Sequence, residues 1–535
     1  MRKAALALIA GAVLLFMTGC GSQSSVSTGT NPSAVTAPVG LTVTDTPPAG
    51  VTVLFFQLSI TGTTLASQSG ASVSLLSSTN PVPVNVSQLQ TESAFLGSAN
   101  VAAGTYNSLS LTFANPVLTI FNASDSEISS TCAVGSVCTF TPPTTSLSGP
   151  LTLSFSSTPF PITLTASSPL AFMLDIHLDT VIQSDLSLNL TATNGVALSQ
   201  LPTPPTGDPI SGLGRLIGTV QSGGTSANPN QFTVQSWDGR TFTINVNSST
   251  TYNYPSTVCS QDSFSCVQSG QVVKVTVSLQ SDGSLLATEV DYLQPATQQS
   301  VEGTIVGLST SSGGNTIMDL VLQMEPVSSM SSTLPLGQHV SVTVPSSGVA
   351  YAVDWGSFTP PSGITLSFGS ASDLEVGQEV LVVVQGSVTT PSASGTNGTP
   401  SSTPVGPAAL AFTTNSISLE PSQITGTVGA VDANSLSFTL QTFPAFFVPP
   451  SATAGAPPTL APIQILIATT TQTNYEGLSP DNFSGVAVND LVSVEGWLFT
   501  LGVVPQWCTA TAGCAPSTVM AAKGVLGRPG PTPLF

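Results

Sequence analysis

Hydrophobic and polar residues alternate along most of the chain downstream of about residue 40. Typical segments, each rich in β-branched or aromatic residues, are Val51–Ser59, Ser108–Phe113 and Thr241–Val246. Gly, Pro, Asn and Asp separate these segments, and there is little helical periodicity. Because alternation places one face of a strand in a core and the other in solvent, the pattern predicts an all-β protein.

The second part of the chain repeats one pattern three times. Each unit starts with a short segment around a Gly-Thr pair, at Ile217–Val220, Glu302–Ile305 and Thr425–Val428. A Gly or Asn turn and a Val-rich strand follow later in each unit, and five or six strands per unit fit a small barrel. We predict small β-barrel-like domains at 206–297, 298–421 (with an insertion) and 422–528, and a tail at 529–535.

The region before these units, 39–205, has a different pattern. About ten short strands in this stretch favour a β-sandwich. Its last residues run into 201–210, which carries four prolines and is typical of a linker. The prediction is therefore an N-terminal β-sandwich followed by a rigid row of three barrels.

The first twenty residues have the pattern of an export signal. Arg2 and Lys3 precede an apolar run, Ala4–Met17, that is too short to span a bilayer comfortably. The run ends in Met17-Thr18-Gly19-Cys20, which resembles the lipobox of bacterial lipoproteins. This resemblance implies a lipoprotein signal peptide at 1–19 and lipidation of Cys20, and the alternative is an ordinary secretory signal.

The residues after Cys20 bear on location. Gly21 implies, through the same resemblance, sorting to the outer membrane, either facing the periplasm or on the surface. Segment 20–38 is rich in Ser, Thr, Gly and Pro and is expected to be a flexible tether. The expected membrane contact is therefore made through acyl chains, palmitate among them, on Cys20.

The other six cysteines form three local pairs in short loop-like segments. The pairs are Cys132 with Cys138, Cys259 with Cys266, and Cys508 with Cys514. In an exported protein an even set of cysteines indicates disulfides. Zinc binding is the alternative, although these spacings are longer than those of zinc sites and the chain has only two histidines.

Charge excludes one class of partner. The chain has 26 acidic and seven basic residues and a formal net charge of −19. Since binding to nucleic acid depends on Lys and Arg that neutralise phosphates, nucleic acid is not a partner. A polysaccharide or an envelope protein is the expected kind of partner instead.

Two sets of residues are candidates for ligand binding. The first set is Asp175, His177 and Asp179, which are two residues apart and on one strand would lie on the same face. They could hold a divalent metal there, or they could form the solvent-exposed face of that strand. The four tryptophans could line a sugar-binding platform, or they are core and rim residues. They are Trp237, Trp355, Trp497 and Trp507.

Catalytic motifs are absent from the sequence. It has no H-E-x-x-H, no G-x-S-x-G and no phosphate loop, and we expect neither an enzyme nor a cofactor. A hydrolase remains an alternative because a carboxylate pair formed in space leaves no sequence signal.

The chain resembles two families without assigned activity. Thr44-Asp45, Gly104-Thr105-Tyr106 and Leu174-Asp175 are similar to a domain of unknown function found in exported bacterial lipoproteins. The Gly-Thr starts and the turns of the later units resemble a second uncharacterised β-domain that occurs in tandem. The sequence therefore indicates a lipid-anchored cell-envelope protein with a structural or adhesive display role, or alternatively a carbohydrate- or metal-binding surface module.

Overall fold

The computed structural model describes the parts of the chain that carry the predicted domains. The described residues are 36–46, 52–76, 80–122, 127–128, 132–141, 150–183, 185–202, 205, 208–223, 229–324, 334–390, 408–441, 464–509, 514 and 516–528. The predicted signal peptide, Cys20, most of the predicted tether and the tail at 529–535 lie outside these residues.

The regular secondary structure of the described residues is almost entirely strand, which confirms the all-β prediction. Two short helical turns occur, α1 (Leu178–Val181) and α2 (Gln506–Thr509), together with short 3₁₀ turns. Among the described residues, none of the helices has the length and apolar character needed to cross a membrane.

The N-terminal domain (β1–β11) is a sandwich of two sheets. One sheet contains β1 (Thr36–Thr46), β5 (Ala94–Ala102), β10 (Leu170–His177) and β11 (Val196–Gln200), in the order β11-β10-β1-β5. The other contains β2 (Thr52–Ser67), β3 (Ser72–Val73), β4 (Val82–Asn85), β6 (Gly104–Phe121), β7 (Val137–Phe140), β8 (Leu151–Phe155) and β9 (Ile162–Leu164). Alternate residues of β1 and β6, such as Leu41, Val43, Leu109 and Leu111, form the core between the sheets.

Three barrels of six strands each follow the N-terminal domain. Barrel 1 contains β12 (Arg215–Ser222), β13 (Gln231–Ser236), β14 (Thr241–Asn245), β15 (Thr251–Asn253), β16 (Gln271–Leu279) and β17 (Leu285–Pro295). Barrel 2 contains β18 (Ser300–Thr310), β19 (Thr316–Met324), β20 (His339–Val344), β21 (Ala350–Val353), β22 (Glu379–Thr389) and β23 (Leu410–Glu420). Barrel 3 contains β24 (Ser422–Asp432), β25 (Ser437–Gln441), β26 (Ile465–Ala468), β27 (Asn474–Glu476), β28 (Leu491–Thr500) and β29 (Thr518–Arg528).

All three barrels have the same strand topology. In barrel 1 the order β12-β13-β14-β17-β16 closes back onto β12, and β15 pairs with β17 in parallel. The corresponding strands of barrels 2 and 3 pair in the same order. The repeated sequence pattern is therefore a repeated fold.

The glycine in the Gly-Thr starts has a packing role in the first two barrels. A Cβ atom on Gly218 would lie 2.3 Å from the carbonyl oxygen of Gln235, and one on Gly303 would lie 2.8 Å from that of Val321. Since real Cβ contacts are longer, only glycine lets the second strand of each barrel come this close to the first.

The three cysteine pairs form the expected local disulfides, Cys132–Cys138, Cys259–Cys266 and Cys508–Cys514. Cys138 of the first disulfide lies in β7 of the N-terminal domain, Cys266 of the second ends a 3₁₀ turn in barrel 1, and Cys508 of the third lies in α2 of barrel 3. Zinc coordination by these cysteines is therefore not the arrangement in the structure.

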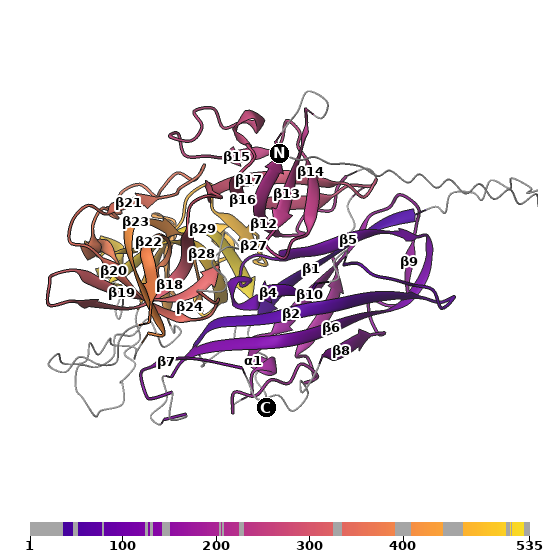
Figure 1. Ribbon diagram of the computed structural model, residues 1–535, viewed down its shortest axis with the longest axis horizontal. Coiled ribbons are helices and arrows are strands. Elements are labelled where there is room, and N and C mark those ends of the chain that lie inside the picture. The colour runs from indigo at the N-terminus through magenta and orange to yellow at the C-terminus, as the bar shows by residue number, and fades with distance from the viewer. Residues whose placement is uncertain are drawn as a thin grey trace, which may run out of the picture.

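The predicted row of domains is wrong, because the barrels gather around the N-terminal domain (Figure 1). Phe95 of β5 belongs to the core of barrel 1, and Phe55 of β2 packs with Val306 and Val321 of barrel 2. Barrels 2 and 3 share one continuous apolar cluster that includes Trp497. Burial of apolar surface between the domains thus joins them into one body.

Candidate functional site

One segment of the N-terminal domain contacts all three barrels. This segment, Asn85–Ser93, joins β4 to β5, includes the 3₁₀ turn η1 (Val86–Gln88), and is called the junction loop below. Val86 and Leu89 are buried in the N-terminal core. Their burial leaves the polar side chains of Gln88, Gln90 and Glu92 to face the barrels.

Barrel 1 contacts the junction loop through its basic residues. Arg215 Nη1 lies 2.5 Å from Glu92 Oε2, and Arg215 Nη2 donates a hydrogen bond of 3.2 Å to the Gln88 carbonyl. Lys274 Nζ lies 4.0 Å from Glu92 and 3.9 Å from Asp291. Burial alone would raise the pKa of Glu92, but the cations of Arg215 and Lys274 lower it to about 2.

Barrels 2 and 3 contact the same loop mostly through amides. Gln88 Nε2 donates a 2.7 Å hydrogen bond to Glu379 of barrel 2. Gln423 of barrel 3 donates a 2.9 Å bond to the Gln88 carbonyl and accepts a 3.0 Å bond from the Gln90 amide. Arg528 of barrel 3 also donates to the Gln90 carbonyl. The loop is therefore tied to every barrel.

All basic residues that follow Lys3 in the sequence lie in or beside this junction. They are Arg215, Arg240, Lys274, Lys523 and Arg528. Lys523 Nζ is 3.6 Å from Glu495, and this carboxylate raises the pKa of Lys523 although burial opposes it. The few cations of an acidic chain thus neutralise carboxylates where the domains meet.

Sequence reasoning did not predict this cluster. It used the basic residues only to derive the net charge, and the contacts join positions such as Gln90 and Gln423 that are hundreds of residues apart. A usable signal does exist, because Arg215, Lys274 and Lys523 are strand residues of a chain in which only 6% of residues are charged.

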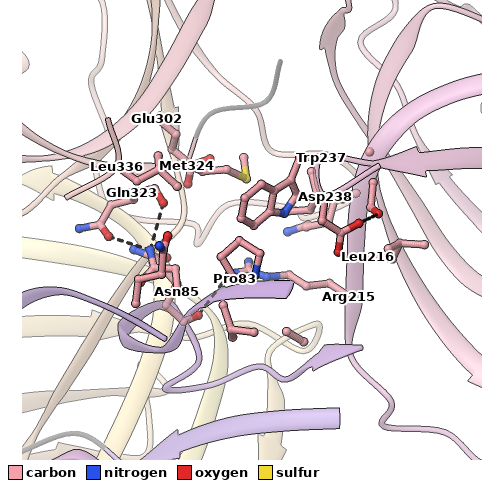
Figure 2. Close-up of a pocket in the computed structure, with 18 of the residues that line it drawn as sticks. Pro83, Asn85, Arg215, Leu216, Trp237, Asp238, Glu302, Gln323, Met324 and Leu336 are labelled. Carbon is pink, nitrogen blue, oxygen red and sulfur yellow. Dashed lines mark hydrogen bonds between the residues drawn. The ribbon is translucent and has the colours of Figure 1, made fainter. Parts of the chain in front are cut away.

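A cleft of about 730 Å³ opens beside the junction loop and is lined by residues of the N-terminal domain and of all three barrels (Figure 2). Pro83 and Asn85 of β4 line one side, and Trp237 of barrel 1 reaches into the cleft from another. This volume is in the range of small-molecule sites, about 300–1,000 Å³.

Three carboxyl groups of barrel 2, those of Glu302, Glu379 and Glu420, line the cleft. Burial, and then the neighbouring Glu302, raise the pKa of Glu379 to about 8 against the opposing hydrogen bond from Gln88. Burial and Glu302 likewise raise the pKa of Glu420 to about 8. The carboxyl groups of Glu379 and Glu420 therefore hold protons near neutral pH and can donate hydrogen bonds as well as accept them.

Trp237 lies on a turn between β13 and β14 that side-chain contacts hold in place. Its side chain is 45% exposed, and Gly239 provides the positive φ of 87° that the turn requires. Asp238 binds Arg240 through contacts of 2.7 Å to both Nε and Nη2. Arg240 also donates to the Leu96 carbonyl, which fixes the turn to the N-terminal domain.

The predicted metal candidates do not share one strand face. β10 ends at His177, whose Nε2 lies 3.3 Å from Asp175, and Asp179 lies in the helical turn α1. The strand ends there because Leu178 and Val181, three residues apart, both turn into the core. In the described parts of the chain, no three His, Cys, Asp or Glu side chains are grouped to hold a metal ion.

The four tryptophans do not form one platform. Trp355 and Trp497 pack against each other with ring centroids 4.8 Å apart, and Trp507 packs against the same apolar cluster of barrels 2 and 3. Trp237 is separate from them and lines the cleft. The interpretation as core residues thus holds for three tryptophans, and Trp237 stays a binding candidate.

Comparison with family models gives two matches. Residues 36–196 match a family described as a domain of unknown function (DUF4382), and residues 218–291 match a second domain of unknown function (DUF5666). The two resemblances drawn from the sequence are therefore confirmed in the N-terminal domain and in barrel 1, and barrels 2 and 3 share the topology of barrel 1. No curated protein and no solved structure matches the chain.

Proposed function

We propose that this chain is a lipid-anchored protein of the bacterial cell envelope with a non-enzymatic, structural or adhesive role. Cys20 would carry the lipid, the segment after it would be the tether, and the four joined domains would be displayed as one body. The outer membrane is the proposed site of anchoring.

The observation that carries this proposal is the set of three disulfides. Disulfides of this local kind persist in oxidising compartments and are rare in the cytosol. An export signal that ends in Cys20 accounts for the same location. The charged junction supports a display role, because bonds from one loop to three barrels keep the body rigid.

Metabolic labelling with radioactive palmitate tests the anchor. We expect label in the wild-type protein and in its membrane fraction, and neither in the Cys20→Ser variant. Label that persists in Cys20→Ser, or unlabelled wild-type protein in the soluble fraction, would contradict lipid anchoring at this residue.

Proteinase K treatment of intact cells tests the orientation. Digestion of the wild-type protein indicates display on the outer surface, and protection until the outer membrane is opened indicates the periplasmic side. Either result agrees with anchoring in the outer membrane, whereas recovery in the inner-membrane fraction would contradict it.

A further inference from the structure

The cleft has one exposed aromatic wall. Trp237 is the one aromatic residue among the large hydrophobic side chains that are strongly exposed in the described parts of the chain. Its indole N–H makes no hydrogen bond to any described residue, and the turn below it is held by Asp238 and Arg240. A rigid, exposed indole beside a cavity offers a flat apolar face and one hydrogen-bond donor to a ligand.

The floor of the cleft is polar. Glu302 projects into the cleft and has no hydrogen bond or ion pair within the described residues. Next to it, Glu379 is 5% exposed and is held by Gln88. An apolar ligand would cover the Glu302 carboxyl and leave it without a hydrogen-bond partner, which is unfavourable.

The cations of the cleft are already paired, which excludes an anionic ligand. Arg215 binds Glu92, Arg240 binds Asp238, and Lys274 lies between Glu92 and Asp291. Any anion would also meet the net charge of −19 of the whole chain. An uncharged ligand with hydroxyl groups for the carboxyl groups and an apolar face for the indole fits the lining of the cleft.

We propose that the cleft binds an uncharged saccharide, with a sugar ring stacked on Trp237 and its hydroxyl groups hydrogen-bonded to Glu302. The C–H face of a pyranose ring matches the indole, and its hydroxyl groups both donate and accept hydrogen bonds. This inference deepens the proposed envelope role and rests on it, because it names the kind of surface to which the displayed body would adhere.

Calorimetric titration of the detergent-solubilised full chain tests the proposal. The probes are the hexasaccharides of maltose, cellulose, xylan and chitin type, with hexagalacturonate as the anionic comparison. We expect at least one neutral probe to bind and hexagalacturonate to bind at least tenfold more weakly. No binding by any neutral probe at millimolar concentration, or binding of hexagalacturonate alone, would overturn the proposal.

Variants connect any binding to the cleft. Trp237→Ala should weaken binding at least tenfold and Trp237→Phe by less, because phenylalanine keeps a stacking face. Glu302→Leu should weaken binding about tenfold, and Glu302→Gln should stay within threefold of the wild type. Val503→Ala, at a residue 83% exposed in barrel 3, is the matched surface control and should not change binding.

Unchanged binding in Trp237→Ala would place the ligand elsewhere and refute the cleft proposal. Because Trp237 is exposed, this variant should keep the wild-type melting temperature, which separates lost binding from lost folding. Release of reducing ends from a bound probe would refute the non-enzymatic role and leave saccharide binding intact. Failure of palmitate labelling would refute the anchor alone.

Discussion

Replacing Glu379 by glutamine should remove a pH dependence of stability. Glu379 is buried at the junction of the domains and accepts a hydrogen bond from Gln88. A glutamine side chain has nearly the same shape, and its amide oxygen can accept the same bond. The substitution therefore removes the ability of this side chain to gain or lose a proton and changes little else.

The magnitude follows from the two pKa values of the Glu379 carboxyl. In the folded protein its pKa is raised from 4.5 to about 8, so folded Glu379 keeps a proton that the unfolded chain loses. The stabilisation is complete below about pH 4.5 and is lost as the pH rises toward 8. Each pH unit in this window lowers the free energy of unfolding by about 1.4 kcal/mol, or about 3 kcal/mol from pH 5.5 to 7.5.

Urea unfolding at a series of pH values, followed by tryptophan fluorescence, measures this effect. The wild type should lose about 3 kcal/mol more than Glu379→Gln between pH 5.5 and 7.5. Glu127→Gln, a change at an exposed glutamate, is the control and should behave like the wild type. If the free energy of unfolding changed equally with pH in Glu379→Gln and in the wild type, the proton would not be held by Glu379 at the junction, and the assignment would be refuted.

Three further predictions test the junction and the barrels. Arg215→Met should destabilise the protein by about 2–3 kcal/mol in urea unfolding, which is less than for a fully buried ion pair because solvent partly screens Glu92. The double variant Arg215→Met/Glu92→Gln should recover part of this loss, and no recovery would argue against the pairing of Arg215 with Glu92. Gly218→Ala should cost about 1–3 kcal/mol by overpacking against the Gln235 carbonyl, whereas Gly62→Ala, with its nearest contact at 3.8 Å, should cost less. Trypsin should cleave the folded protein slowly, because the basic residues beyond Lys3 lie at the junction, and fast cleavage after Arg215 in native buffer would contradict the packing described here.

The sequence was sufficient for the architecture within each domain. Alternation of apolar residues predicted the strands, since a strand with one buried face needs that period. The Gly-Thr starts predicted three related units, and Gly218 shows the reason in its close approach to Gln235. The short separation within each cysteine pair predicted the disulfides.

The arrangement of the domains could not be predicted in the same way. It depends on single long-range bonds, such as that between Gln88 and Glu379, which leave no periodic trace in the chain. The metal candidates were misplaced for a related reason, because the burial of Leu178 and Val181 ends the strand before Asp179. The cleft forms from residues of all four domains, so Trp237 could be named from the sequence but its surroundings could not.

The junction loop has a consequence for how this chain could change over evolutionary time. Tandem copies of a small barrel would ordinarily be gained or lost one at a time. Here deleting barrel 1 would leave Glu92 without Arg215 and Lys274, and deleting barrel 3 would leave the carbonyls of Gln88 and Gln90 without Gln423 and Arg528. Deleting barrel 2 would likewise leave the Gln88 side chain without Glu379, so we expect the loss of any one barrel to destabilise the other domains.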